Sequence, residues 1–121
     1  MKLWTDASKS YLAVKDENGA AFVVSTCPNK RTINELEYLA IIEGLLYAYR
    51  CGEAGVALVT DSQVAERHIN GTYKCKEPRL QALRACVLAV CKLFPNGVTV
   101  GWMRGEDNPA DQPSRKGVAN A

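Results

Sequence analysis

The chain has 121 residues, of which 47% are hydrophobic and 23% are charged, and its formal net charge is +2. These values are typical of a soluble globular protein with one domain that buries a full core. No apolar run reaches the roughly 18 residues of a membrane-spanning helix, and the N-terminus lacks the layout of a signal peptide. We therefore expect a cytoplasmic protein without membrane contacts.

The five cysteines are an odd number, and no two of them have C-x-x-C spacing. This pattern argues against both a disulfide framework and a structural zinc site. We predict free thiols in a reducing compartment, most of them small residues of the core. They are Cys27, Cys51, Cys75, Cys86 and Cys91.

The first part of the chain predicts three antiparallel strands and a long helix. Strands are expected over residues 2–7, 11–15 and 20–26, with Asn18-Gly19 as a hairpin turn between the second and third. A loop over residues 27–31 follows.

The long helix is expected over residues 33–50, and it is apolar nearly all round. Thr32 or Asn34 can cap its start, and Gly52 is suited to its end. Such a helix is predicted to be buried on several sides.

The second half predicts two strands and three helices. A strand over 55–60 leads into a short helix over 62–69, and a longer helix over 78–94 precedes a strand over 98–103. A final helix begins near Pro109. The element order is therefore βββαβααβα, which predicts an α/β domain with a mixed five-stranded sheet flanked by helices. We expect residues 1–116 to form the domain and residues 117–121 a flexible tail.

Four acidic residues fall where a carboxylate needs a partner: Asp6, Glu37, Asp61 and Asp111. Each also has a structural interpretation, as an edge-strand charge, a hydrogen-bonded helix residue, a helix N-cap and a first-turn helix charge, respectively. Adjacent strands would bring such positions to one end of the sheet. Four clustered carboxylates cannot all stay ionised without cations, and oxygen ligands favour Mg²⁺ or Mn²⁺.

Four motifs in chain order carry a family resemblance. They are Thr5-Asp6-Ala7-Ser8, Asn34-x-x-Glu37, Thr60-Asp61-Ser62 and Asn108-Pro109-Ala110-Asp111. With the order βββαβααβα, the chain from residue 2 to about 116 resembles ribonuclease H of type one, in a compact, retroelement-like or archaeal-like form. The resemblance implies an endonuclease that cleaves the RNA strand of an RNA/DNA hybrid and leaves 5′-phosphate and 3′-hydroxyl ends. We expect the protein to be a monomer.

The resemblance also implies roles for individual residues. Asp6 would bridge two divalent ions, Mg²⁺ or Mn²⁺, with Asp61 and Glu37 on either side and Asp111 completing one coordination shell. Contacts to the hybrid are implied for Ala7, Ser8, Arg31, Asn34, Ser62, Gln63 and Lys74. Lys76 and Arg79 are further candidates for phosphate contacts, with a solvated surface charge as the alternative.

The chain departs from the family pattern at three places. The turn at Lys9-Ser10 lacks the glycine-rich sequence, only residues 72–77 stand where larger members carry a basic insertion, and the loop before the last aspartate has no histidine. Arg104 or Glu106 could assist there, and His68 is expected at the surface.

Two other functions remain compatible with the sequence. One is a DNA-acting nuclease or resolvase of the same fold. The other is a nucleic-acid-binding module without catalysis, although an idle cluster of four carboxylates would repel itself and cost stability.

Overall fold

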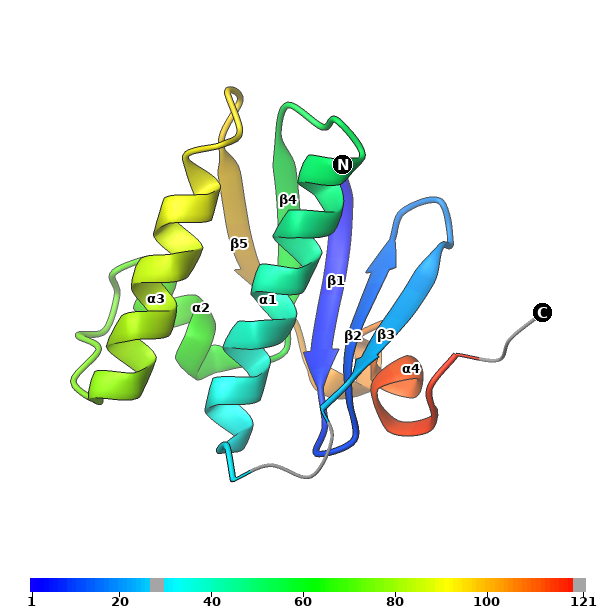
Figure 1. Ribbon diagram of the computed structural model, residues 1–121, viewed down its shortest axis with the longest axis horizontal. Coiled ribbons are helices and arrows are strands. Elements are labelled where there is room, and N and C mark those ends of the chain that lie inside the picture. The colour runs from blue at the N-terminus through cyan, green and yellow to red at the C-terminus, as the bar shows by residue number, and fades with distance from the viewer. Residues whose placement is uncertain (27–29, 119–121) are drawn as a thin grey trace.

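The computed structural model describes residues 1–26 and 30–118, and these form one five-stranded sheet with helices packed against it (Figure 1). The elements follow the predicted order, with one short 3₁₀ helix in addition. They are β1 (Lys2–Ala7), β2 (Tyr11–Asp16), β3 (Ala21–Ser25), α1 (Ile33–Arg50), β4 (Val56–Thr60), α2 (Gln63–Ile69), α3 (Pro78–Cys91), β5 (Val98–Trp102), η1 (Gly105–Asp107) and α4 (Asp111–Lys116).

The sheet order β3-β2-β1-β4-β5 puts the first strand of the chain at its centre. β1 pairs antiparallel with β2 and parallel with β4, so that Thr5 lies opposite Thr60. Parallel neighbours end at the same edge of a sheet. Asp6 near the end of β1 and Asp61 just after β4 therefore lie at one edge, as the sequence predicted.

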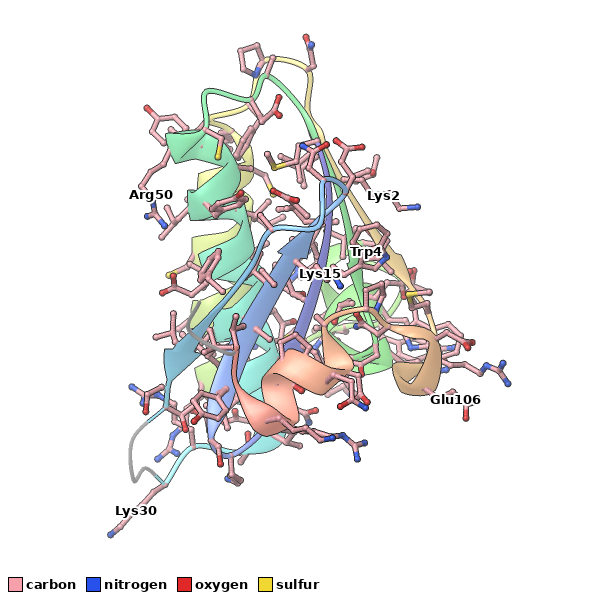
Figure 2. All side chains as sticks on the ribbon, turned by 90° about the vertical axis from the view of Figure 1, so that its right-hand side faces the viewer. Lys2, Trp4, Lys15, Lys30, Arg50 and Glu106 are labelled. Atoms are coloured by element: carbon pink, nitrogen blue, oxygen red, sulfur yellow. The ribbon has the colours of Figure 1, made fainter. Side chains whose placement is uncertain are left out.

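The first helix packs unusually close to the central strand. A Cβ atom at Gly44 of α1 would lie 2.9 Å from Cγ2 of Thr5, so a larger residue would push the helix outward. Helices α1 and α3 lie over one face of the sheet, and α4 lies over the other against β1, β2 and β3 (Figures 1 and 2). This close approach brings the N-terminal half of α1 to the edge where Asp6 lies.

The ends of the helices follow from local hydrogen bonds. Thr32 and Glu35 form the predicted capping box at the start of α1. The predicted end of α3 at residue 94 is wrong, because Lys92, Leu93 and Phe94 donate to carbonyls three residues back in a tighter turn.

The last helix begins at Asp111 and not at Pro109, because the Asn108 side chain accepts from the Ala110 amide and holds residues 108–110 in a turn. Residues 119–121 of the predicted flexible tail lie outside the described residues.

The described cysteines differ in their exposure from what the sequence predicted. Cys51 and Cys86 are exposed free thiols, so the expectation of core cysteines is wrong for both. Cys51 follows the last turn of α1, and Cys86 lies on the outer side of α3; Cys27 falls outside the described residues. Within residues 1–26 and 30–118, no helix has the length and hydropathy needed to span a bilayer.

Candidate active site

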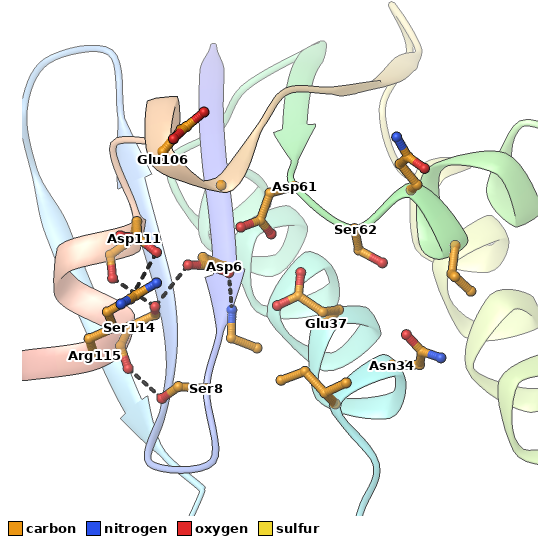
Figure 3. Close-up of a pocket in the computed structure, with 15 residues that line it drawn as sticks. Asp6, Ser8, Asn34, Glu37, Asp61, Ser62, Glu106, Asp111, Ser114 and Arg115 are labelled. Carbon is orange, nitrogen blue, oxygen red and sulfur yellow. Dashed lines mark hydrogen bonds and ion pairs between the residues drawn. The ribbon is translucent and has the colours of Figure 1, made fainter.

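An open cleft of about 700 Å³ lies at the sheet edge where β1 and β4 end (Figure 3). Its walls come from β1, the start of α1, the β4–α2 junction, η1 and α4. All four predicted acidic residues line it: Asp6, Glu37, Asp61 and Asp111. Among residues 1–26 and 30–118, no histidine or cysteine lines it.

Three of these carboxylates form a compact group. Oxygens of Asp6, Asp61 and Asp111 all lie within 4.8 Å of one another. Glu37 is not a member of this group, but its carboxylate reaches the same space from α1, across the cleft from α4 (Figure 3). The end of β1, the residue after β4 and the start of α4 thus each bring one carboxylate to the same place.

Burial and mutual repulsion make this group unstable as free anions. Asp6 is 5% exposed, and its burial, followed by the negative charge of Asp61, raises its pKa to about 7. Glu37 is 6% exposed, and its burial, again followed by the charge of Asp61, raises its pKa to about 10. A bound cation would lower the pKa of both carboxyl groups, because it favours their ionised forms. The all-oxygen donor set fits hard divalent ions, so the residues present suit a metal site.

Both oxygens of Asp6 are held by hydrogen bonds. Oδ1 accepts from the amide of Ala7 at 2.8 Å, and Oδ2 accepts from the Ser114 hydroxyl of α4 at 2.8 Å. The carboxylate at the centre of the cleft is therefore fixed in its orientation.

The turn after β1 is closed by Ser8 in place of a glycine-rich sequence. The Ser8 hydroxyl accepts from the amides of Ser10 and Tyr11, each at 3.1 Å, and donates to the carbonyl of Ser114. This explains how the short Lys9-Ser10 turn is stable, and it ties the turn to α4.

The connection from β5 to α4 is fixed on the central strands. The Asn108 amide donates to the carbonyl of Thr5 at 2.9 Å, and the Trp102 indole donates to the carbonyl of Asp61 at 3.0 Å. A Cβ atom at Gly105 would lie 2.9 Å from Oδ2 of Asp61. The segment that carries Asp111 is thus seated directly beside Asp6 and Asp61.

Most of the residues implied in substrate binding line the cleft. They are Ala7, Ser8, Asn34, Ser62 and Gln63, together with the auxiliary candidate Glu106. The hydroxyl of Ser62 accepts from the Ala65 amide as the N-cap of α2, which commits it to the helix.

Three implied residues do not line the cleft: Arg31, Lys74 and Arg104. Lys74 borders a separate hollow against α3, and Arg104 forms ion pairs with Glu106 at 3.2 Å and Asp107 at 3.0 Å. Arg79, a further phosphate candidate, lies 3.7 Å from Glu35.

His68, which was expected at the surface, is only partly exposed on α2, and its Nδ1 atom is enclosed without a hydrogen-bond partner. The cause is α3, where Arg84 donates to the His68 carbonyl and packs against this part of α2.

Several residues of the cleft were not predicted from the sequence. Ser114 bonds to Asp6, and Arg115 lies 3.2 Å from Asp111 in an ion pair. They stand three and four residues after Asp111, where helical neighbours meet, so a helix beginning at Asp111 would have indicated them. The exposed apolar side chains Ile33 and Val64 line the opposite wall.

Comparison with known proteins agrees with this geometry. Residues 4–116 match the model of the reverse transcriptase-like family. No curated protein matches the sequence significantly.

Solved structures resemble the fold over most of its length. The RNase H domain of a Mycobacterium tuberculosis protein, solved as a fusion with maltose-binding protein, has a TM-score of 0.75 and 20% identity, over 96% of this chain and 92% of that chain. LC11-RNase H1 in complex with an RNA/DNA hybrid has a TM-score of 0.73 and 22% identity, over 92% and 91%.

RNase H1 from the halophilic archaeon Halobacterium salinarum has a TM-score of 0.69 and 22% identity, over 85% of this chain and 84% of that chain. Sequence identities this low show only that the folds are alike. The match to the family model shows that the chain is a member of that family. The chain therefore belongs to the reverse transcriptase-like family, and its fold is that of the ribonuclease H structures above.

Proposed function

We propose that this protein is a monomeric, divalent-metal-dependent endonuclease that hydrolyses the RNA strand of RNA/DNA hybrids and leaves 5′-phosphate and 3′-hydroxyl ends. The observation that carries the proposal is the group formed by Asp6, Asp61 and Asp111, whose oxygens lie within 4.8 Å of one another in the cleft of a ribonuclease H fold. The solved relative in complex with an RNA/DNA hybrid supports this choice of substrate.

Asp6, Asp61 and Asp111 would hold two divalent ions, Mg²⁺ or Mn²⁺, with Glu37 completing the site. The chemistry that a metal bound there would supply is activation of a water and stabilisation of charge on the leaving 3′-oxygen. The protein's own part is to fix the carboxylates: Ala7 and Ser114 orient Asp6, and Asn108 seats the segment that carries Asp111. No side-chain nucleophile is required.

Residues in the walls of the cleft would bind the substrate and distinguish it from other nucleic acids. Asn34 and Gln63 offer amide groups that can bond to 2′-hydroxyls and to base edges in a minor groove. The contact with the 2′-hydroxyl is how a protein distinguishes RNA from DNA. Arg115 is an exposed cation at the same opening and is suited to a backbone phosphate.

A cleavage assay tests the proposal. Hybrid, duplex DNA and duplex RNA of one sequence are incubated with the protein in EDTA, Mg²⁺ or Mn²⁺. Cleavage of the RNA strand of the hybrid, only with metal, is expected. Cleavage of duplex DNA but not of hybrid would establish the DNA-acting alternative, and absence of cleavage with every substrate would contradict the proposal and favour a module without catalysis.

A matched pair of variants tests the site. Asp6→Asn should abolish cleavage, because it removes a charge from the centre of the group. Asp16→Asn is the control, since Asp16 is equally buried at the other end of the sheet and bonds to Tyr47. The control should lose stability but retain cleavage. Full activity in Asp6→Asn would contradict the proposal.

A further inference from the structure

Ser114 occupies a position from which one hydroxyl can hold the centre of the acidic group. It lies on α4 with 1% of its surface exposed, three residues after Asp111. Its Oγ atom is 2.8 Å from Oδ2 of Asp6 and 2.8 Å from the carbonyl oxygen of Asp111 (Figure 3). A hydroxyl has a single proton, and an ionised carboxylate is a stronger acceptor than a carbonyl, so the proton goes to Asp6.

This bond determines which way the Asp6 carboxylate faces. The Ala7 amide takes Oδ1 and Ser114 takes Oδ2, so each oxygen has one donor and keeps a further lone pair. A carboxylate held at both oxygens cannot rotate freely about its Cβ–Cγ bond. It is therefore pre-oriented to offer both oxygens to cations in the cleft.

Ser114 is itself fixed by its surroundings. Its carbonyl accepts from the Ser8 hydroxyl, and Ser8 in turn accepts from the amides of Ser10 and Tyr11. The backbone of α4 is thus anchored to the turn that follows β1. Because Asp111 begins the same helix, this anchorage sets the position of Asp111 relative to Asp6 as well.

We propose that Ser114 is a positioning residue for the metal ligand Asp6, and that its hydroxyl raises the affinity of the site for divalent cations by pre-orienting that carboxylate. The inference rests on the proposed function, in which Asp6 binds metal. Loss of a hydrogen bond that orients a metal ligand typically lowers metal affinity about 10- to 100-fold.

The experiment measures metal binding directly, by calorimetric titration of Mn²⁺ into the intact protein, beside thermal unfolding in EDTA. Ser114→Ala should weaken Mn²⁺ binding at least about tenfold. Ser114→Thr keeps the hydroxyl and should recover most of the affinity. Should Ser114→Ala fail to fold, Ser114→Cys keeps the shape of the side chain with a slightly larger atom and a weaker donor, and it should also lower the affinity.

Tyr47→Phe is the matched control. It also removes a hydroxyl that donates to a buried carboxylate, at 2.7 Å to Asp16, but far from the cleft. It should lower the unfolding temperature and leave the Mn²⁺ affinity unchanged.

The outcomes separate this inference from the proposed function. If wild-type protein binds Mn²⁺ but Ser114→Ala binds it equally well, the positioning role is refuted while the metal site stands. Equal losses in Ser114→Ala and Tyr47→Phe, or no recovery in Ser114→Thr, would likewise refute it. If the wild-type protein binds no Mn²⁺ at all, the proposed function itself fails.

Discussion

Gly105 lies against Asp61 so closely that a Cβ atom there would be 2.9 Å from Oδ2 of the carboxylate. Any other residue at this position has to displace the Asp61 side chain, since the two groups cannot share that space. The absence of a side chain at Gly105 is therefore part of how the acidic group is assembled.

We predict that Gly105→Ala lowers cleavage of the hybrid with little loss of stability. The displaced atom is the end of a side chain, which can rotate away, but Asp61 then leaves its place beside Asp6. Because a misplacement of about 1 Å can cost about 100-fold in rate, a smaller shift here should cost on the order of tenfold. The measurement is kcat under saturating Mg²⁺, with the unfolding temperature recorded in parallel.

Gly101→Ala is the control for that variant. A Cβ atom at Gly101 has no neighbour within 4 Å, and the residue has no left-handed backbone angle. Its activity and stability should match the wild type. Equal activity of Gly105→Ala and Gly101→Ala would show that the Asp61 contact is unimportant.

Without metal, the protein should lose stability as the pH rises from about 4 to 10. Asp6 and Glu37 have pKa values raised to about 7 and about 10, so the folded state binds protons that the unfolded state has released. Their stabilising protonation is complete below their ordinary pKa values and is lost as the pH passes through the raised ones. For Asp6 alone the change in the free energy of unfolding is on the order of 4 kcal/mol.

Urea unfolding in EDTA at pH 5, 7 and 9 measures this dependence. Asp6→Asn should flatten the part of the curve between pH 5 and 7, and saturating Mn²⁺ should restore stability at pH 7 and above. A wild-type protein whose stability in EDTA is the same at pH 5 and pH 9 would contradict the burial of these charges.

Asn108→Ala should be among the more destabilising single substitutions in the site. The Asn108 side chain is 4% exposed, donates to the Thr5 carbonyl and accepts from the Ala110 amide, each at 2.9 Å. Its removal takes a hydrogen-bond partner from two buried backbone groups, at a cost of about 2–3 kcal/mol. Chemical denaturation measures the loss, and Mn²⁺ affinity should fall with it because Asp111 is released.

Asn70→Ala provides the comparison for Asn108. Its amide also donates to a strand carbonyl, that of Val100 at 2.9 Å, but the residue is exposed and remote from the cleft. We expect a loss of about 1 kcal/mol with normal metal binding. A smaller effect of Asn108→Ala than of Asn70→Ala would argue against the role of Asn108.

Arg115→Ala should raise the KM for hybrid several-fold while changing stability by less than about 0.5 kcal/mol. The Arg115 side chain is 70% exposed, so its ion pair with Asp111 contributes little to the stability of the fold. The same side chain nevertheless places a positive charge at the mouth of the cleft. If it contacts one phosphate, the slope of log affinity against log salt should fall by about one.

Lys116→Ala removes the same charge from the neighbouring residue of α4, which is exposed but does not line the cleft. Its KM and salt slope should stay close to those of the wild type. Equal effects of the two substitutions would mean that Arg115 acts only through net charge.

Much of the fold could be predicted from the sequence because the signals are local. The Asn18-Gly19 turn, the Thr32 capping box and the apolar run of α1 each depend on neighbours within a few residues, and all are present. Element ends were less predictable. The last turn of α3 and the start of α4 are decided by hydrogen bonds that compete with the helix, such as that from Ala110 to Asn108.

The sequence alone determined which four carboxylates to consider, since each lies at a junction where a charge is costly unless it has a partner. The tertiary structure decided what surrounds them. Ser114 meets Asp6 across 108 positions of the chain, and Asn108 meets Thr5 across 103. Contacts of that range depend on the parallel pairing of β1 with β4 and on the seating of α4 over β1. Neither leaves a periodic or local trace in the residues that make them.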